Sequence, residues 1–212
     1  MRQHVNPLSN HFEDIQPIPK LSNIFDDPLK PLHLDVGCAS GDFLFELAFQ
    51  NKSWNYLGIE IREKLVQKAN NKLENSNFGN LFFAFGNAHN LINECFERFP
   101  KDILYSISFY FPDPWFKKKH HKRRVLQPEF INTISKIMPP GGLLLIKSDV
   151  RELFESMDQI TSDSLMFKRL NPIEKKEIFL GFNPSNLKTE REKYVLSLKK
   201  FIYEETFQRL AS

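Results

Sequence analysis

The sequence is poor in cysteine and lacks a long apolar run, and each absence excludes a class of protein. Its 2 cysteines, Cys38 and Cys95, form no Cys-x-x-Cys pair and no cluster with histidine, so we expect neither a disulfide framework nor a metal site. The longest apolar runs are no longer than Leu81–Phe85, far short of the ~18 residues of a membrane-spanning helix. Residues 1–20 are polar and interrupted by proline, unlike a secretory signal. We therefore expect a cytoplasmic protein that does not bind a membrane.

Length and composition favour one folded domain over a disordered chain. The 212 residues are 41% hydrophobic and 13% aromatic, which is enough to bury a core. Residues 1–31 hold 5 of the 13 prolines, and we expect them to form an extended or weakly ordered arm before a domain that spans residues 32–212. The net charge of +3 is too small to identify a partner by itself.

Short apolar segments alternate with helix-length segments along most of the chain. Strands are expected at Leu32–Val36, Tyr56–Glu60, Leu81–Phe85, Ile103–Phe109 and Leu143–Lys147. Helices are expected at Asp42–Phe49, Arg62–Leu73, Leu91–Phe99, Pro128–Ile137 and Val150–Met157. This alternation predicts an α/β fold with a doubly wound, mostly parallel sheet. Beyond these elements the pattern is weaker and predicts strands at Phe167–Leu170 and Tyr194–Leu198 and a short helix near Glu204–Leu210.

Glycine is scarce, and two of the 8 glycines lie between the first strand and the first helix. Gly37 and Gly41 are four residues apart, with the small Ala39 between them. Glycine permits a tight turn and close approach of a ligand, and the following helix offers free N–H groups. The spacing is not Gly-x-Gly-x-x-Gly, and the lysine of a phosphate-binding P-loop is missing. The turn therefore favours a ligand without pyrophosphate, although a bare strand–helix turn is the alternative.

The next two strands also end in residues that suit an adenosine. Glu60 ends the second expected strand, where a carboxylate accepts hydrogen bonds from ribose hydroxyls, and Asn87 follows the third, where its amide suits an adenine edge. A solvated charge is the alternative for Glu60. Asp35, just before the glycine turn, suits the cationic end of a methionine group. Together these residues favour S-adenosylmethionine over NAD.

The loop after the fourth expected strand holds a carboxylate between two prolines. Pro112 and Pro114 restrict the backbone around Asp113, and Trp115 offers a flat face on which a base can stack. Six of the eight residues 117–124 are lysine or arginine, and none is acidic. Without this basic tract the chain has 23 basic residues against 26 acidic ones. The alternative for the loop is a rigid connection, and the alternative for the basic tract is a solvated surface. Because the tract directly follows the loop, we favour binding of an anionic polymer at the active edge.

These motifs together resemble those of the bacterial tRNA (guanine-N7)-methyltransferases, in the same order over roughly residues 30–200. The resemblance rests on Asp35-Val36-Gly37 with Gly41, Gly58-Ile59-Glu60, Gly86-Asn87-Ala88, the segment Phe111–Arg124 and Lys147-Ser148-Asp149. It implies the seven-stranded, Rossmann-like fold of class I methyltransferases. It also implies transfer of a methyl group from S-adenosylmethionine to N7 of guanine at position 46 in the variable loop of tRNA.

The resemblance also implies roles for individual residues. Asp113 is expected at the catalytic centre, and cofactor contact is implied for Asp35, Glu60, Asn87 and Asp113, in addition to the contact that the turn itself predicts for Gly37 and Gly41. Substrate contact is implied for Lys117, Asp149, Thr189 and Glu192. RNA contact is implied for Lys119, His120, His121, Lys122, Arg123 and Arg124. The sequence departs from the family pattern at Arg191, which replaces an aromatic residue, and at Ala39, where glycine is frequent.

Two other functions fit parts of the sequence. An amino-methyltransferase also uses a proline-containing loop after the fourth strand, but its usual Asn/Asp-Pro-Pro-Tyr is here Asp113-Pro114-Trp115-Phe116. A non-catalytic RNA-binding module would explain the basic tract but not Asp35, Glu60 and Asn87. The sequence is compatible with a monomer or a homodimer.

Overall fold

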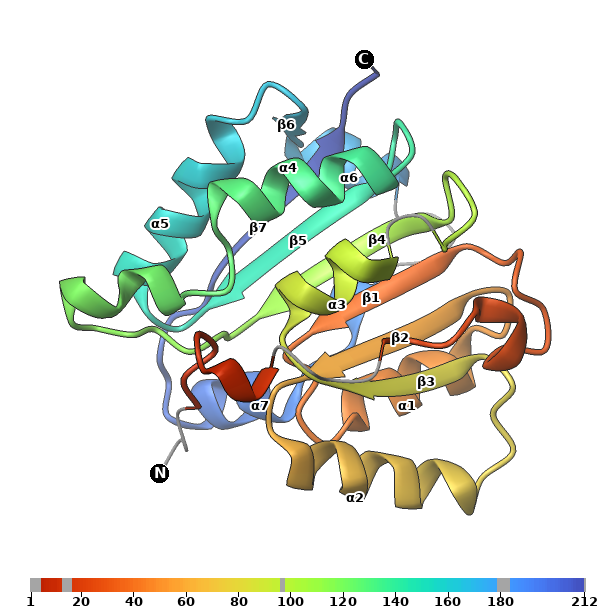
Figure 1. The fold of residues 1–212 in the computed structure, drawn as a ribbon. Coiled ribbons are helices and arrows are strands. Elements are labelled where there is room, and N and C mark those ends of the chain that lie inside the picture. Colours follow the sequence, from red (N-terminus) through yellow and green to blue (C-terminus); the bar gives the residue numbers. More distant parts are fainter. Residues whose placement is uncertain (1–4, 13–16, 96–97, 179–183, 212) are drawn as a thin grey trace.

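The strands of the protein form one sheet. The computed structural model describes residues 5–12, 17–95, 98–178 and 184–211. Its strands are β1 (Leu32–Val36), β2 (Asn55–Glu60), β3 (Leu81–Phe85), β4 (Leu104–Tyr110), β5 (Leu143–Ser148), β6 (Phe167–Arg169) and β7 (Tyr203–Arg209). Within the described ranges, the seven strands are ordered β3-β2-β1-β4-β5-β7-β6 (Figure 1). The five strands expected between residues 32 and 147 are confirmed, with ends that shift by at most one residue.

The strand directions define the edge at which a ligand binds. Strands β1 to β5 are parallel, and β7 runs antiparallel between β5 and β6. The chain order reverses between β1 and β4, so the connections diverge at the carboxyl ends of these two strands. Open α/β sheets bind their ligands at such a point.

Helices cover both faces of the sheet (Figure 1). One face packs against α3 (Ala88–Cys95), α4 (Pro128–Ile137) and α5 (Arg151–Ser162), and the other against α1 (Asp42–Gln50), α2 (Glu63–Glu74) and α7 (Glu190–Ser197). A further helix, α6 (Pro172–Ile178), follows β6. Of the helix expected at Leu91–Phe99, residues 96 and 97 lie outside the described residues. The apolar side chains form one buried cluster on each face, as a doubly wound fold requires.

The C-terminal elements differ from the sequence prediction. The strand expected at Tyr194–Leu198 is wrong, because these residues continue α7, whose first turn is capped by the Thr189 hydroxyl accepting from the backbone N–H of Glu192 at 3.1 Å. The helix expected near Glu204–Leu210 is also wrong, because these residues lie in and just after β7. Their glutamate and glutamine favour a helix locally, but β7 hydrogen-bonds to a strand on each side, which local propensity does not reflect.

The proline-rich segment is not an extended, weakly ordered arm in the part that the structure describes. Ile18, Leu21 and Phe25 are buried in the core cluster on the α3–α4 side, and Phe12 is buried near the end of β3. The prolines keep the backbone out of regular helix, but the apolar residues between them gain free energy by covering the sheet. The proposed domain boundary at residue 31 stays a prediction.

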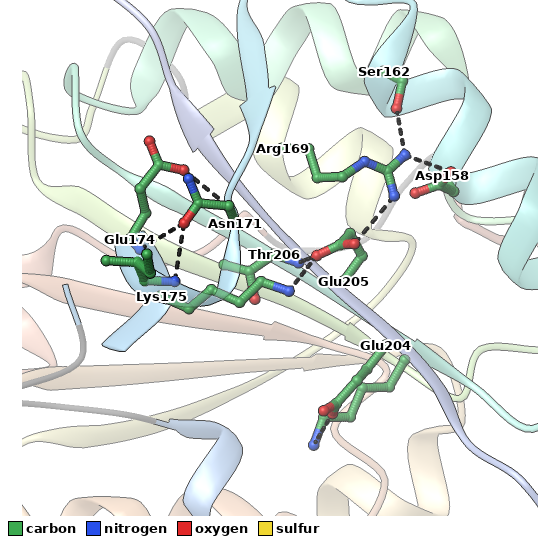
Figure 2. Close-up of polar contacts among 11 residues, drawn as sticks. Asp158, Ser162, Arg169, Asn171, Glu174, Lys175, Glu204, Glu205 and Thr206 are labelled. Carbon is green, nitrogen blue, oxygen red and sulfur yellow. Dashed lines mark hydrogen bonds and ion pairs between the residues drawn. The ribbon is translucent and has the colours of Figure 1, made fainter. Parts of the chain in front are cut away.

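Ion pairs hold the antiparallel edge of the sheet against its helices (Figure 2). The Glu205 carboxylate on β7 accepts from Arg169 on β6 at 3.1 Å and from Lys175 on α6. Arg169 also reaches Asp158 on α5 at 2.7 Å. This network joins β7 to β6, α5 and α6, and β7 in turn pairs with β5, the strand that precedes Asp149. Among the described residues, none of the helices has both the length and the apolar character that a membrane crossing requires.

Candidate functional site

A cavity of about 450 Å³ lies at the carboxyl ends of β1, β2, β3 and β4. This volume falls within the range of small-ligand and cofactor sites. The cavity is lined by the predicted cofactor residues Gly37, Glu60, Asn87 and Asp113. Four successive strand ends, far apart in the sequence, therefore contribute to one pocket.

The glycine turn has the conformation that its residues predict. Gly37 and Gly41 have φ angles of 87° and 75°, which favour glycine, and Ala39 between them has 52°. A Cβ at Gly41 would lie 2.4 Å from the Phe83 ring, so Gly41 packs the turn onto the sheet. A Cβ at Gly37 would meet nothing within 4 Å, because this residue faces open space in the cavity.

The Glu60 carboxylate is buried, with only 2% of the residue exposed, and all its acceptor positions are used. One oxygen accepts from the backbone N–H and Nε of Arg62 at 3.0 and 2.9 Å. The other accepts from the backbone N–H of Ala39 at 3.0 Å and from Nη2 of Arg62 at 2.9 Å. This geometry excludes the alternative of a solvated charge. The Arg62 side chain, which sequence reasoning missed, also lines the cavity.

Asp35 is oriented by a buried hydrogen-bonded chain from β1 and β4. The Ser108 hydroxyl donates to its carboxylate at 2.6 Å, and the Ser108 oxygen lies 3.3 Å from Nε2 of His33. Because a hydroxyl has one proton, Nε2 of His33 must donate to Ser108, and Nδ1 accepts from the Ser106 hydroxyl at 2.9 Å. Burial lowers the pKa of His33 to about 3, so its ring is neutral near pH 7.

The pKa of Asp35 is set by opposing effects. Burial raises its pKa to about 7, the hydrogen bond from Ser108 opposes this rise, and the nearby Glu60 carboxylate adds to it. The adjacent Cys38 thiol has its pKa raised, chiefly by burial, and stays neutral. Asp35 is therefore poised to lose its proton when a cation binds beside it.

The N-terminal segment forms one wall of the cavity, which the sequence did not indicate. Val5, Pro7, Leu8 and Ser9 line the pocket. The Asn87 amide donates to the backbone carbonyl of Pro7 at 2.8 Å. The contact joins residues 80 positions apart, and no local pattern marks it.

The loop after β4 is strained and rigid. Phe111 and Trp115 have φ angles of 53° and 44°, which L-residues rarely adopt, and such strain persists only where the surroundings enforce it. The Phe111 N–H donates to the carbonyl of Lys147 on β5 at 2.8 Å. Asp113, between these two residues, lines the cavity. The Arg123 guanidinium lies over one face of the Trp115 ring, 5.0 Å from its centre.

The basic tract forms a short 3-10 helix, Lys118–Arg123, and its side chains differ in exposure. The exposed lysines are Lys117, Lys118, Lys119 and Lys122. Arg124 is buried instead: it donates to the carbonyl of Pro114 at 3.0 Å and to Glu152 on α5 at 2.8 Å. Its guanidinium holds the loop against α5. Arg124 therefore differs from the other predicted RNA contacts, which are exposed or half-buried.

The remaining predicted residues gather at the end of β5 and the start of α7, outside the cavity lining. Lys147 is buried between Glu192, at 3.4 Å, and Glu204, at 3.1 Å. Asp149 pairs with Arg191. The residue that departs from the family pattern thus contacts a predicted substrate residue.

Among the described residues, no group of three or more His, Cys, Asp or Glu side chains could hold a metal ion.

Comparison with known proteins decides the family. Residues 29–205 match the model of a family described as putative methyltransferase. A tRNA (guanine-N(7)-)-methyltransferase of Prochlorococcus marinus is 56% identical over 210 residues, 99% of this chain and 100% of that protein. One of Synechocystis sp. is 40% identical over 211 residues, 99% and 97% of the two chains. The chain belongs to the tRNA (guanine-N7)-methyltransferase family.

Solved structures agree with this family at the level of the fold. An rRNA methylase from Streptococcus thermophilus has a TM-score of 0.52 at 15% identity, over 90% of this chain and 92% of that one. The predicted Rossmann-like class I methyltransferase fold is confirmed. Membership in the tRNA (guanine-N7)-methyltransferase family confirms the predicted enzyme class and S-adenosylmethionine as its methyl donor.

The geometry divides the predicted residues of this tRNA (guanine-N7)-methyltransferase into three groups. Those that line the cavity are Gly37, Glu60, Asn87, Asp113, Lys122, Arg123 and Arg124. Those that lie directly behind or beside it are Asp35 and Gly41. Those on neighbouring elements are Lys117, Lys119, His120, His121, Asp149, Thr189 and Glu192. The roles of the individual residues stay predictions.

Proposed function

We propose that the protein transfers the methyl group of S-adenosylmethionine to N7 of guanine at position 46 in the variable loop of tRNA. One observation carries the proposal: the cavity that Glu60 and Asn87 line is also lined by Asp113 and by Lys122 of the basic tract. A cofactor site and a polyanion-binding surface therefore meet at one carboxylate. The relatives are named for the same substrate and the same guanine nitrogen.

The cavity fits S-adenosylmethionine. Gly37 leaves room for close approach, and Asn87 suits the adenine edge. Glu60 suits the ribose hydroxyls, which would take the two acceptor positions that the Arg62 side chain now fills. Asp35 suits the ammonium group of the methionine part. When bound, the cofactor supplies a methyl group on a positively charged sulfur.

The chain's own residues have a limited chemical task. N7 of guanine carries a lone pair and no proton, so no side chain has to act as a general base. Catalysis then rests on holding the base in line with the methyl group and on stabilising positive charge that develops on the purine. Asp113 is suited to the latter, because it lines the cavity on a loop whose backbone is restricted by two prolines and by the positive φ of Phe111 and Trp115. Its charge also contributes to the raised pKa of Arg62, after the larger effect of the Glu60 hydrogen bonds.

The polar group at β5 and α7 is suited to recognise the guanine. The Asp149 carboxylate can accept hydrogen bonds from N1–H and the amino group of guanine, whereas adenine has no N1–H to donate. Lys117, Thr189 and Glu192 complete the proposed substrate contacts. Arg191 orients Asp149, and the Lys147–Glu192 pair places α7 beside it.

The exposed side of the basic tract is suited to contact the tRNA backbone. Lys119 and Lys122 are exposed, and His120, His121 and Arg123 lie beside them. We propose that these residues contact phosphates, while Arg124 holds the tract in place from within. A cytoplasmic location and a monomeric or homodimeric state accompany this proposal.

The decisive test is to incubate the purified protein with unmodified tRNA and methyl-labelled S-adenosylmethionine, and to map the labelled nucleoside. The expected product is 7-methylguanosine at position 46, and Asp113→Ala serves as the control. Label on an exocyclic amino group of adenine would instead show an amino-methyltransferase. Binding of tRNA without label and without calorimetric binding of the cofactor would show a non-catalytic RNA-binding module.

A further inference from the structure

Three aromatic side chains form a surface patch beside the proposed site. Phe201 is 70% exposed, and its ring contacts that of Tyr203 edge-on, with 4.8 Å between the centroids. Tyr203 in turn stacks on Phe154 of α5 at 5.6 Å and an interplanar angle of 29°. We call these three residues the aromatic patch. Phe201 is the exposed ring of the patch, and the half-buried Tyr203 and Phe154 support it from the sheet and from α5. A contiguous apolar patch of this kind on a surface marks an interaction site more often than a single exposed residue does.

The aromatic patch lies at the active edge of the sheet. Tyr203 is the first residue of β7 and pairs in register with Ser148, the residue before Asp149. Phe154 lies in the first turns of α5, which begins two residues after Asp149. The patch is therefore on the α5 side of the sheet, beside the segment between β5 and α5 that carries Asp149, whereas α7 lies on the other face.

The aromatic patch and the basic tract both contact the N-terminal end of α5. Glu152, two residues before Phe154, accepts from Arg124 at 2.8 Å and lies 3.4 Å from Nε2 of His121. This contact joins the start of α5 to the tract. The proposed phosphate-binding surface and the aromatic patch thus border the same helix end.

Cationic side chains flank the exposed ring. Lys199 and Lys200 directly precede Phe201, and both are exposed. Arg151 is also exposed and pairs with Glu155 at 2.7 Å. Exposed rings with adjacent lysines are the combination that binds single-stranded nucleic acid, because rings stack bases while lysines contact phosphates.

The backbone that presents Phe201 is held in place. Lys199 has a φ of 53°, and its N–H donates to the carbonyl of Leu196 at 2.9 Å. The N–H of Lys200 donates to the carbonyl of Val195 at 3.2 Å. The turn between α7 and β7 is therefore preorganised, so stacking on Phe201 costs little ordering of the chain.

We infer that the aromatic patch is a second tRNA contact, on which an unpaired base near the target guanine stacks, with Lys199 and Lys200 on the adjoining phosphates. The inference rests on the proposed function, because it takes tRNA as the occupant. It adds a base-stacking surface that neither the basic tract nor the cavity supplies.

The test measures tRNA affinity by fluorescence anisotropy, which does not require turnover. Phe201→Ala is expected to raise the Kd for unmodified tRNA about 5- to 150-fold, the range that loss of a stacking aromatic produces. The affinity for S-adenosylmethionine and the rate at saturating tRNA should not change. Phe201→Trp should retain tRNA affinity. The matched control is Phe49→Ala, which removes an equally exposed ring, 71%, at the far end of α1.

Equal tRNA affinity of the Phe201→Ala and Phe49→Ala variants would overturn the inference. If Phe201→Ala does not fold, the Lys199→Gln, Lys200→Gln double variant decides: it should flatten the salt dependence of binding by up to ~0.9 per lost contact, and an unchanged slope would also overturn it. If Phe201→Ala weakens tRNA binding but the wild-type protein methylates no tRNA, the proposed function is refuted while the aromatic patch remains a tRNA contact.

Discussion

Replacing Ser108 with alanine should change how cofactor affinity depends on pH. The Ser108 hydroxyl donates to the Asp35 carboxylate at 2.6 Å and so stabilises its ionised form. Only the ionised form attracts the ammonium group of S-adenosylmethionine. Affinity should therefore rise as the pH increases through the pKa of Asp35, which is about 7, over the range in which the cofactor's ammonium group keeps its proton.

The size of the effect follows from the lost hydrogen bond. A hydrogen bond to a charged group contributes about 1.5–3 kcal/mol, and 1.36 kcal/mol corresponds to one pKa unit. Without Ser108 the pKa of Asp35 should rise by about 1–2 units. At pH 7 the ionised fraction would then fall from about half to between ~1% and ~10%, so cofactor affinity should drop roughly 5- to 50-fold. The loss should largely disappear near pH 9 to 10.

The assay is isothermal titration calorimetry with S-adenosylmethionine between pH 6 and 10. Ser106→Ala is the matched control, because Ser106 is also buried and also bonds to His33 but does not contact Asp35. Its midpoint should stay near that of the wild type. The groups facing Asp35 are Glu60 on β2, Cys38 in the turn and Ser108 on β4, and the variant removes only the last. The midpoint is the pH at which cofactor affinity reaches half its maximum. An unchanged midpoint in Ser108→Ala, or an equal shift in Ser106→Ala, would refute the proposed role of the Ser108 hydrogen bond to Asp35.

Asp113→Ala should reduce methyl transfer by roughly 10²- to 10³-fold while tRNA affinity stays within twofold, measured by label incorporation and anisotropy; near-normal turnover would remove Asp113 from the reaction. Replacing Lys119 and Lys122 with glutamine should flatten the salt dependence of tRNA binding by up to ~0.9 per lost phosphate contact, and an unaltered slope would place RNA contact elsewhere. Asp35→Asn should abolish cofactor binding but raise the Tm at pH 8. Because the pKa of Asp35 is raised on folding, the contribution of this residue to the free energy of unfolding is fully present below pH ~4 and is lost as the pH rises through ~7. Asparagine stays neutral, so its contribution does not change with pH. A Tm gain at pH 8 no larger than at pH 4 would contradict this.

Much of the fold could be predicted because its signals are local. The bounds of β1 and β3 coincide with the apolar runs Leu32–Val36 and Leu81–Phe85, and α4 begins and ends where its pattern does, at Pro128 and Ile137. The C-terminal third was harder. Tyr203–Arg209 contains residues that favour a helix, and only pairing with two neighbouring strands makes it β7.

Some residues of the candidate site could likewise be predicted from the sequence, and others could not. Gly37, Glu60, Asn87 and Asp113 were predictable because each lies at or just after the end of a strand, and parallel strands bring their ends to one edge. Arg62 was not, because nothing in its sequence neighbourhood shows that its side chain fills the acceptor positions of Glu60. The burial of Arg124 was equally hidden, since it depends on Glu152 from another element.

The sequence by itself determined the alternation of strands and helices, the turn at the end of β1, the rigid Asp113 loop and the basic tract. These features depend on backbone preferences and hydrophobic spacing within a few residues. Only the tertiary structure decided that Pro7 bonds to Asn87, that Ser108 orients Asp35, and that Phe154 and Tyr203 share a surface. The physical reason is that side-chain partners depend on where the crossovers return the chain. Two segments that are far apart in sequence carry no local record of their contact.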